Sequence, residues 1–140
     1  MSGKVGKHKP FAFGRLTVKN NQTGFGWTSP KPMKIFVDSG ASITILPPSA
    51  LPVLKQKTGN FDMVPARVQT ANGIKEAIAL KDVSLCLEGS CFRGNVLVSD
   101  GINGDVLVGS DFLTKAGCKV DFKKKTMKCR GGQLRFRMEV

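Results

Sequence analysis

Asp38 is the residue of this sequence whose neighbours suit acid–base chemistry. Asp38 follows the apolar run Ile35–Val37, and a second apolar run, Ile43–Leu46, carries the chain away. Between them lie four small residues: Ser39, Gly40, Ala41 and Ser42. The pattern predicts a buried strand that ends in a tight turn with Asp38 at its tip, because small residues let another backbone approach closely. A rigid, partly dry seat of this kind suits a carboxylate that acts as a general acid or base.

Length and composition favour a single domain with its own core. The chain has 140 residues, of which 41% are hydrophobic, and this is enough to bury a core. Its apolar stretches are only a few residues long, whereas a membrane span needs about 20. We therefore expect no membrane contact. The basic, polar segment 1–10 carries no secretory signal, which favours a cytoplasmic protein.

The charge of the chain is strongly positive. It carries 22 Lys and Arg against 10 Asp and Glu, a net charge of +12. Basic residues are dense in Lys4–Lys9, Lys123–Lys125 and Lys128–Arg137. The charge fits either a solvated surface or the attraction of nucleic acid through the basic ends. Aromatic residues that could stack on bases are few, because Tyr is absent and Trp27 is the only Trp.

The rest of the pattern predicts an all-β domain with little helix. The loop Asn20–Pro32 should hold Trp27 as a packing residue, and Ser49–Lys55 favours a turn of helix. A short helix is expected over Asp111–Ala116, capped by Ser110 and closed by Gly117. Strands are expected over Phe11–Lys19, Met33–Val37, Ile43–Leu46, Asp62–Thr70, Ile74–Leu80, Val83–Leu87, Cys91–Val98, Val106–Gly109, Val120–Phe122 and Thr126–Lys128.

Asn72-Gly73 gives the strongest hairpin signal in the chain, because it separates two alternating runs. The hairpin is either an ordinary surface element or a mobile flap over a cleft.

The four cysteines allow either disulfides or free thiols. Two-residue turns at Glu88-Gly89 and Lys123-Lys124 would bring the cysteines face to face in pairs, near disulfide distance. Without a secretory signal, reduced and packed thiols are the expectation. The facing pairs would be Cys86 with Cys91 and Cys118 with Cys129. The spacing of the four cysteines fits no zinc site.

A second landmark makes the Asp38 loop more specific. Val106-Leu107-Val108-Gly109 is a short apolar run into Gly before the expected helix. The Asp-Ser-Gly-Ala-Ser loop, the hairpin and this motif, in that order, resemble the retroviral-type aspartic proteases, or retropepsins. The segment Lys119–Thr126 looks most like proteases of gypsy-type long-terminal-repeat retrotransposons. The resemblance covers residues 34–129. It implies an all-β, closed-barrel acid-protease fold with one short helix in the C-terminal half, active as a C2 homodimer.

The resemblance also implies roles for matching residues. The catalytic group would be Asp38, Ser39 and Gly40, with Leu107 and Gly109 supporting the loop from behind. No metal and no cofactor are expected. Ser42 and Ser110 stand where many viral members carry an Asp–Arg pair, so hydroxyl hydrogen bonds should replace it. Substrate would contact Ala41, Ser42, Thr70, Ala71, Asn72, Gly73, Ile74 and Val108.

The domain plan that follows has three parts. Residues 1–32 would form a basic strand and loop or a linker, 33–129 the protease domain, and 130–140 a basic tail or a dimer strand. The expected function is an aspartic endopeptidase that cleaves a retroelement polyprotein in the cytoplasm, with a virus-like particle as one setting. Two rivals stay open: a cellular protease domain of the ubiquitin-shuttle or skin type, and an inactive basic domain that binds nucleic acid.

Overall fold

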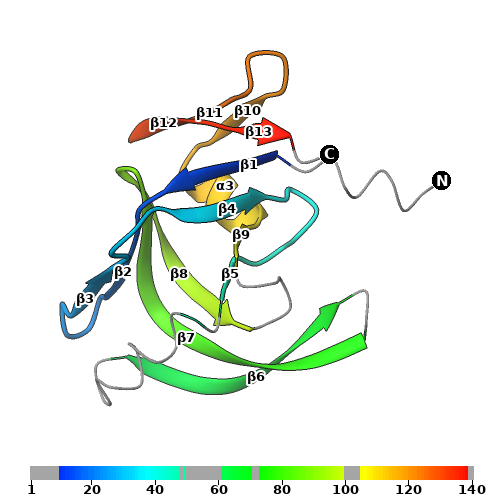
Figure 1. Cartoon of the computed structure of the whole chain (residues 1–140). Helices are drawn as coiled ribbons and strands as arrows, with labels where there is room; N and C mark the ends of the chain where they lie inside the picture. The colour runs from blue at the N-terminus through cyan, green and yellow to red at the C-terminus, as the bar shows by residue number, and fades with distance from the viewer. Residues whose placement is uncertain (1–9, 48, 50–60, 71–72, 100–104, 139–140) are drawn as a thin grey trace.

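The computed structural model describes residues 10–47, 49, 61–70, 73–99 and 105–138. The described strands form a curled ten-stranded sheet and a separate three-stranded sheet, and the described helix packs behind the larger one (Figure 1). The large sheet runs in the order β13-β1-β4-β9-β5-β8-β7-β2-β3, with β6 paired to β7 beside this path. The small sheet has the order β10-β11-β12.

The strands of the first half are β1 (Pro10–Gly14), β2 (Leu16–Asn20), β3 (Gly26–Thr28), β4 (Met33–Val37), β5 (Ile45–Leu46) and β6 (Asp62–Thr70). Those of the second half are β7 (Gly73–Leu87), β8 (Ser90–Val98), β9 (Val106–Val108), β10 (Lys119–Asp121), β11 (Thr126–Cys129), β12 (Gly132–Arg135) and β13 (Arg137–Met138). Helix α3 spans Ser110–Lys115. The expected helical turn at Ser49–Lys55 lies almost entirely outside the described residues.

The centre of the large sheet is built from continuous apolar runs. β9 is buried along its whole length, and so is the second half of β4. The two strands pair in parallel, with Ile35 opposite Val106. β5 lies between β9 and β8, antiparallel to the first and parallel to the second. Strands buried on both faces read as unbroken hydrophobic sequence rather than as alternation, so these short runs form the core that holds the Asp38 loop.

The predicted first strand, Phe11–Lys19, is two strands in the structure. The chain turns a corner at Arg15, so β1 pairs with β4 while β2 pairs with β7. Hydrogen bonds hold the corner: the Arg15 N–H donates to Glu88 Oε1 at 3.0 Å, and its guanidinium donates to the carbonyl of Ser29 at 3.2 Å. The predicted loop Asn20–Pro32 also contains β3, whose Trp27 packs against the main core.

β7 is one long strand with an irregularity where two strands were expected. The pairing of β7 with β8 shifts between Leu80 and Val83, and Asp82 there has a φ of +51°. The Asp82 carboxylate accepts two hydrogen bonds from Arg93 on β8. Arg93 Nε donates to Asp82 Oδ1 at 2.8 Å, and Arg93 Nη2 donates to Asp82 Oδ2 at 3.1 Å. Asn21 Nδ2 donates to the Asp82 carbonyl at 3.2 Å. On the hairpin side of the bulge, Ile78–Leu80 still pair with β8, and only Gly73–Ala77 pair with β6 alone in the described ladders.

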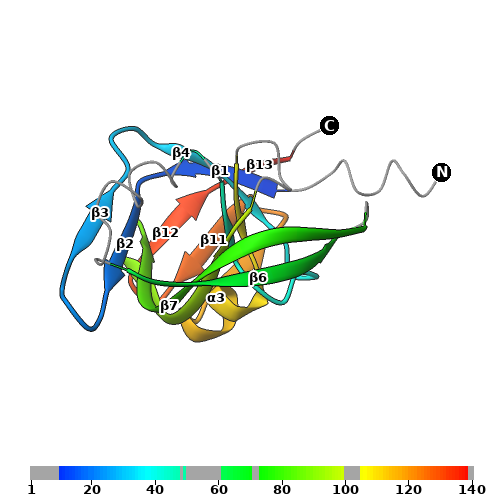
Figure 2. The ribbon, with the colours of Figure 1, turned by 90° about the horizontal axis from the view of Figure 1, so that it is seen from below.

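The β6–β7 hairpin lies where the sequence predicts it. Each residue of β6 pairs across to β7, ending with Thr70 opposite Gly73. Gly73 has a φ of +105°, a backbone conformation that favours glycine, so it begins β7 just after the turn. The hairpin projects toward the side of the molecule where β1 starts and β13 ends (Figures 1 and 2). Residues 71–72 of its expected tip lie outside the described part of the chain.

The C-terminal segment folds back on its own chain. β12 pairs with β11, and β13 pairs with β1 with Arg137 opposite Phe11. A second core cluster joins this segment to the large sheet through Ala12, Val37, Met127 and Phe136. Residues 132–135 and 137–138 are therefore strands that pair within the chain. The three-part division of the chain stays a prediction, although strands on both flanks pair within one sheet.

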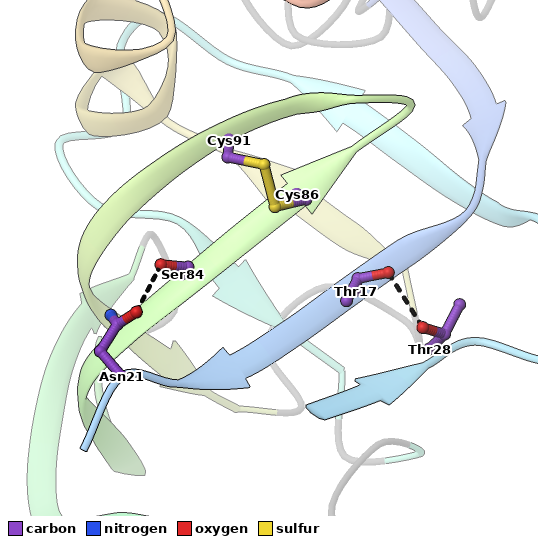
Figure 3. The surroundings of a disulfide bond; sticks show 6 residues. All are labelled: Thr17, Asn21, Thr28, Ser84, Cys86 and Cys91. Carbon is purple, nitrogen blue, oxygen red and sulfur yellow. Dashed lines mark hydrogen bonds between the residues drawn. A yellow bond between two sulfur atoms is a disulfide. The ribbon is translucent and has the colours of Figure 1, made fainter. Parts of the chain in front are cut away.

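Both cysteine pairs are disulfides, so the expectation of reduced thiols is wrong. The β7–β8 hairpin turns through Glu88-Gly89, and Cys86 is bonded to the facing Cys91. Figure 3 shows this bond beside the Thr17–Thr28 and Ser84–Asn21 hydrogen bonds of the neighbouring strands. Cys118 and Cys129 are bonded across the ends of β10 and β11. The cross-strand register places the two cysteines of each pair face to face. The expectation of thiols rested instead on the predicted cytoplasmic location.

The all-β architecture with one short helix after the second landmark agrees with the expected retropepsin-like fold. α3 has six residues, and no helix in the described ranges is long and apolar enough to cross a membrane.

The bulge gives a pH prediction. The hydrogen bonds from Arg93 are the largest cause that lowers the pKa of Asp82 from 3.8 to about 2. A carboxyl whose pKa falls on folding stabilises the native state above its unfolded pKa, and this contribution is lost as the pH falls toward the folded value. Arg93→Met should return the pKa of Asp82 toward 3.8 and remove this acid sensitivity between about pH 4 and pH 2.

Side-chain carboxyl NMR titration would measure the pKa of Asp82 directly. Lys119→Met is the matched control, because it removes an exposed cation on β10 that has no contact with Asp82. A pKa of Asp82 that is equal in the two variants would contradict the role of Arg93.

The disulfides give a chemical prediction. Thiol titration of the denatured protein should find no free cysteine before reduction and four afterwards, because all four cysteines are bonded. Peptide mapping without reduction should link Cys86 to Cys91 and Cys118 to Cys129. Four free thiols in the unreduced, purified protein would contradict both bonds.

Candidate active site

Asp38 sits at the tip of a hydrogen-bonded turn between β4 and β5. The Gly40 N–H donates to Asp38 Oδ1 at 3.0 Å, and the Ala41 N–H donates to the Asp38 carbonyl at 3.1 Å. A Cβ on residue 40 would lie 3.2 Å from that same carboxylate oxygen. Asp38 is half-buried, whereas Ser39, Gly40 and Ser42 are exposed. The carboxylate therefore accepts a hydrogen bond from one backbone N–H, and it is presented at the surface of the single chain.

The turn is attached to the second landmark from behind. The Asp38 N–H donates to the Val108 carbonyl at 2.9 Å, and the Ser110 N–H donates to the Ala41 carbonyl at 2.7 Å. Gly109 lies between these bonds. A Cβ there would lie 2.8 Å from the carbonyl oxygens of both Ala41 and Ile43, so only glycine fits this backbone contact. The support that the sequence predicted for Gly109 has this physical basis.

A buried polar pair that the sequence analysis missed completes the attachment. Thr44 is fully buried, and its hydroxyl donates to Asp111 Oδ1 at 2.8 Å while accepting the Gly109 N–H at 3.1 Å. The Thr44 N–H donates to Asp111 Oδ2 at 3.1 Å. Asp111 lies in the first turn of α3, where a negative charge is favourable. Each polar group is paired, as burial requires.

This pair also corrects an expectation. The hydroxyls of Ser42 and Ser110 were expected to replace an ion pair of viral members at this position. In the described chain, Thr44 and Asp111 make the hydrogen bonds that join the Asp38 loop to α3. A Thr within the apolar run Ile43–Leu46, and an acid just after a Gly-Ser step, were the signals available in the sequence.

The predicted substrate residues fall into three groups. Ala41 is half-buried and Ser42 exposed on the Asp38 loop. Gly73 and Ile74 lie at the start of β7, where Ile74 keeps 66% of its surface exposed. Val108 is fully buried in the main core, so its side chain presents no surface to a peptide in the single chain. We therefore group Val108 with Leu107 and Gly109, behind the loop.

The expected flap lies on the same side of the molecule as the Asp38 loop (Figure 1). The hairpin is largely exposed, including Val64 near its base and Ile74 near its tip. An exposed apolar side chain on a projecting hairpin is available for contact with another molecule. Thr70 lies at the end of β6, and Ala71 and Asn72 of the predicted flap tip fall outside the described residues.

Three features together define a retroviral-type aspartyl-protease-like domain. They are a curled β-sheet, an Asp-Ser-Gly turn that packs on the glycine before a short helix, and a projecting hairpin between these two landmarks. The profile of the family described as "gag-polyprotein putative aspartyl protease" matches residues 29–115, which is more than half of the chain. The chain belongs to this family.

Two further proteins are similar to the chain. Protein DNA-DAMAGE INDUCIBLE 1 of Arabidopsis thaliana is 28% identical over 107 residues, which cover 74% of this chain and 25% of that protein. The chain thus spans a quarter of that relative. The crystal structure of the retroviral protease-like domain of Ddi1 from Leishmania major aligns with a TM-score of 0.52 and 17% identity, over 91% of this chain and 96% of that one. This likeness supports the fold.

The contact at Gly109 gives a stability prediction. Gly109→Ala should lower the free energy of unfolding by about 1–3 kcal/mol, because the new methyl group would push on two backbone carbonyls that cannot swing away. Urea unfolding monitored by circular dichroism would measure the loss. Gly26→Ala is the control, since its Cβ would meet nothing closer than the Val18 carbonyl at 3.8 Å. Equal stability of the two variants would contradict the close contact.

Proposed function

We propose that this domain is an aspartic endopeptidase in which two copies of the chain each supply one Asp38. The observation that supports this most is the turn itself, where the Gly40 N–H donates to the half-buried Asp38 carboxylate and the turn packs on Gly109. The sequence contains Asp-Ser-Gly once. A mechanism with two carboxylates therefore requires a second chain, related by a two-fold axis that brings the two turns together.

In the proposed dimer the two Asp38 carboxylates share one proton, because two negative charges a few ångströms apart are too costly. The pair then titrates as a unit. The ionised carboxylate takes a proton from a water molecule, which attacks the carbonyl carbon of the substrate. The protonated partner donates a hydrogen bond to the carbonyl oxygen, and the amide nitrogen takes up a proton as the C–N bond breaks. No covalent bond forms between enzyme and substrate.

The remaining residues of the turn have supporting roles in this proposal. The Ser39 hydroxyl, exposed in the single chain, would hydrogen-bond the partner's turn across the axis. Gly40 would let the substrate backbone approach. The peptide would lie as an extended strand between the turn and the β6–β7 hairpin, with exposed Ile74 as one apolar contact.

We assign the peptide substrate to a retroelement polyprotein. The family profile, which is that of a gag-polyprotein protease, supports this assignment. A cellular peptide substrate is the second candidate, because the Arabidopsis relative and the Leishmania structure are both DNA-damage-inducible 1 proteins. A polyprotein enzyme should release itself from its own flanking sequence when that sequence is fused to it, whereas a cellular enzyme should leave the fusion intact.

Substitution of Asp38 tests the proposal directly. Asp38→Asn keeps the size and the turn but cannot supply the shared proton, so cleavage of a diverse peptide mixture should fall to the uncatalysed background. Wild-type cleavage should be blocked by a statine-type inhibitor. Mass spectrometry of the products between about pH 4 and pH 7 would measure both effects.

Asp121→Asn is the matched control, because Asp121 is the last residue of β10 and its carboxylate accepts only the N–H groups of Lys123 and Lys124 among the described hydrogen bonds. Its cleavage should equal that of the wild type. Solution mass would be measured in parallel. A wild-type dimer that cuts no peptide, or an Asp38→Asn variant that still cuts, would refute the proposal.

A further inference from the structure

The outer face of β13, β1 and β4 carries aromatic rings and cations together. These strands lie side by side (Figure 1), with Arg137 opposite Phe11 and Phe11 opposite Phe36. Phe13 is opposite Lys34 in the next row. Residues opposite one another on paired strands point to the same face. The other face of β1 and β4 is the buried one, which holds Ala12, Ile35 and Val37.

The rings on this face contact one another and a cation. Phe11 lies 6.0 Å from Phe13 and 6.1 Å from Phe36, measured between ring centroids. Lys34 Nζ sits 4.5 Å from the centroid of Phe11 and 4.9 Å from that of Phe36. Phe13 nevertheless keeps 56% of its surface exposed. An exposed ring held in place by neighbouring rings is a ready-made stacking surface.

A groove of about 460 Å³ runs between β1 and the last strands, beside these rings. Four exposed cations line it, and no acidic side chain does. None of the four forms an ion pair or a side-chain hydrogen bond within the described part of the chain. Their charges are thus available to an anionic ligand. They are Lys124, Lys125, Arg135 and Arg137.

The two exposed aromatic residues of the described chain also lie at this groove. Four large apolar residues are exposed: Phe13, Val64, Ile74 and Phe122. Val64 and Ile74 belong to the β6–β7 hairpin. Phe13 lines the groove, and Phe122 packs against the groove residue Phe136 at 5.9 Å between ring centroids. Both exposed aromatic residues therefore lie at the groove, where the cations gather.

We propose that this groove binds single-stranded nucleic acid, with the phosphates along the four cations and unpaired bases stacked on Phe13 and its neighbours. Flat rings interleaved with cations fit a chain that alternates bases and phosphates. A contact between this groove and the same groove of a second copy is unfavourable, because four cations would face four others. The site includes Arg135 and Arg137 of the basic C-terminal segment, and it is independent of peptide cleavage.

Fluorescence anisotropy with a labelled 20-nucleotide oligouridine, titrated over a range of salt concentrations, tests the cations. Lys124→Gln combined with Lys125→Gln should flatten the slope of log K against log salt by about 1.4, because each phosphate contact on a single strand contributes about 0.7. Lys19→Gln combined with Lys81→Gln is the control with the same change of charge, on exposed positions of β2 and β7. Equal slopes in the two double variants would contradict the proposed site. They would favour attraction of the oligonucleotide by the net charge of the chain or by its basic ends.

A second variant tests the stacking. Phe13→Leu keeps an apolar side chain but removes the ring, and it should weaken oligouridine binding about tenfold with the salt slope unchanged. A duplex of equal length should bind more weakly than the single strand, because its bases are already stacked. Unchanged affinity of Phe13→Leu, or tighter binding to the duplex, to polyglutamate or to phosphatidylserine vesicles, would overturn the proposal. Unchanged thermal unfolding would confirm that the variants are folded.

Discussion

The contact between the Gly109 backbone and the carbonyls of Ala41 and Ile43 is the constraint on which the candidate site depends. It fixes where the turn after β4 can lie, and the bonds from Asp38 to Val108 and from Ser110 to Ala41 follow from it. The same contact requires β9 to pass directly behind the turn, between β4 and β5. A side chain at residue 109 would separate the two segments, and the half-buried carboxylate would lose its rigid seat.

Two further devices separate the rigid part of the molecule from the part that projects. The buried Thr44–Asp111 pair ties the exit of the turn to α3, so the loop is held at both ends. At the other side, the bulge at Asp82 interrupts the pairing of β7 with β8 between Leu80 and Val83. The bidentate bond from Arg93 joins the two strands there. Between Gly73 and Ala77, β7 pairs with β6 alone in the described ladders, so this outer part of the hairpin is stabilised mainly by its own ladder, which suits the flap role proposed for it.

Local signals predicted the elements whose structure is decided locally. The turn at Asp38, the β6–β7 hairpin and the helix after Gly109 each depend on residues close in sequence. The corner at Arg15, strand β3 and the return of β13 to β1 depend on partners far along the chain, so one sequence does not reveal them. The cysteines show the same limit: their cross-strand pairing followed from the turns, but the expectation of thiols came from the compartment.

The pairing of β1 with β13 bears on how a second chain could complete the site. Both strands are already satisfied within one chain, so an exchange of chain ends between two copies would have to break the bonds between Phe11 and Arg137. β13 is also the last strand on its side of the large sheet, and its outer edge is not paired in the described chain. Such an edge can accept a further strand. Two identical edges that pair antiparallel obey a two-fold axis, which is the symmetry that two Asp38 turns require.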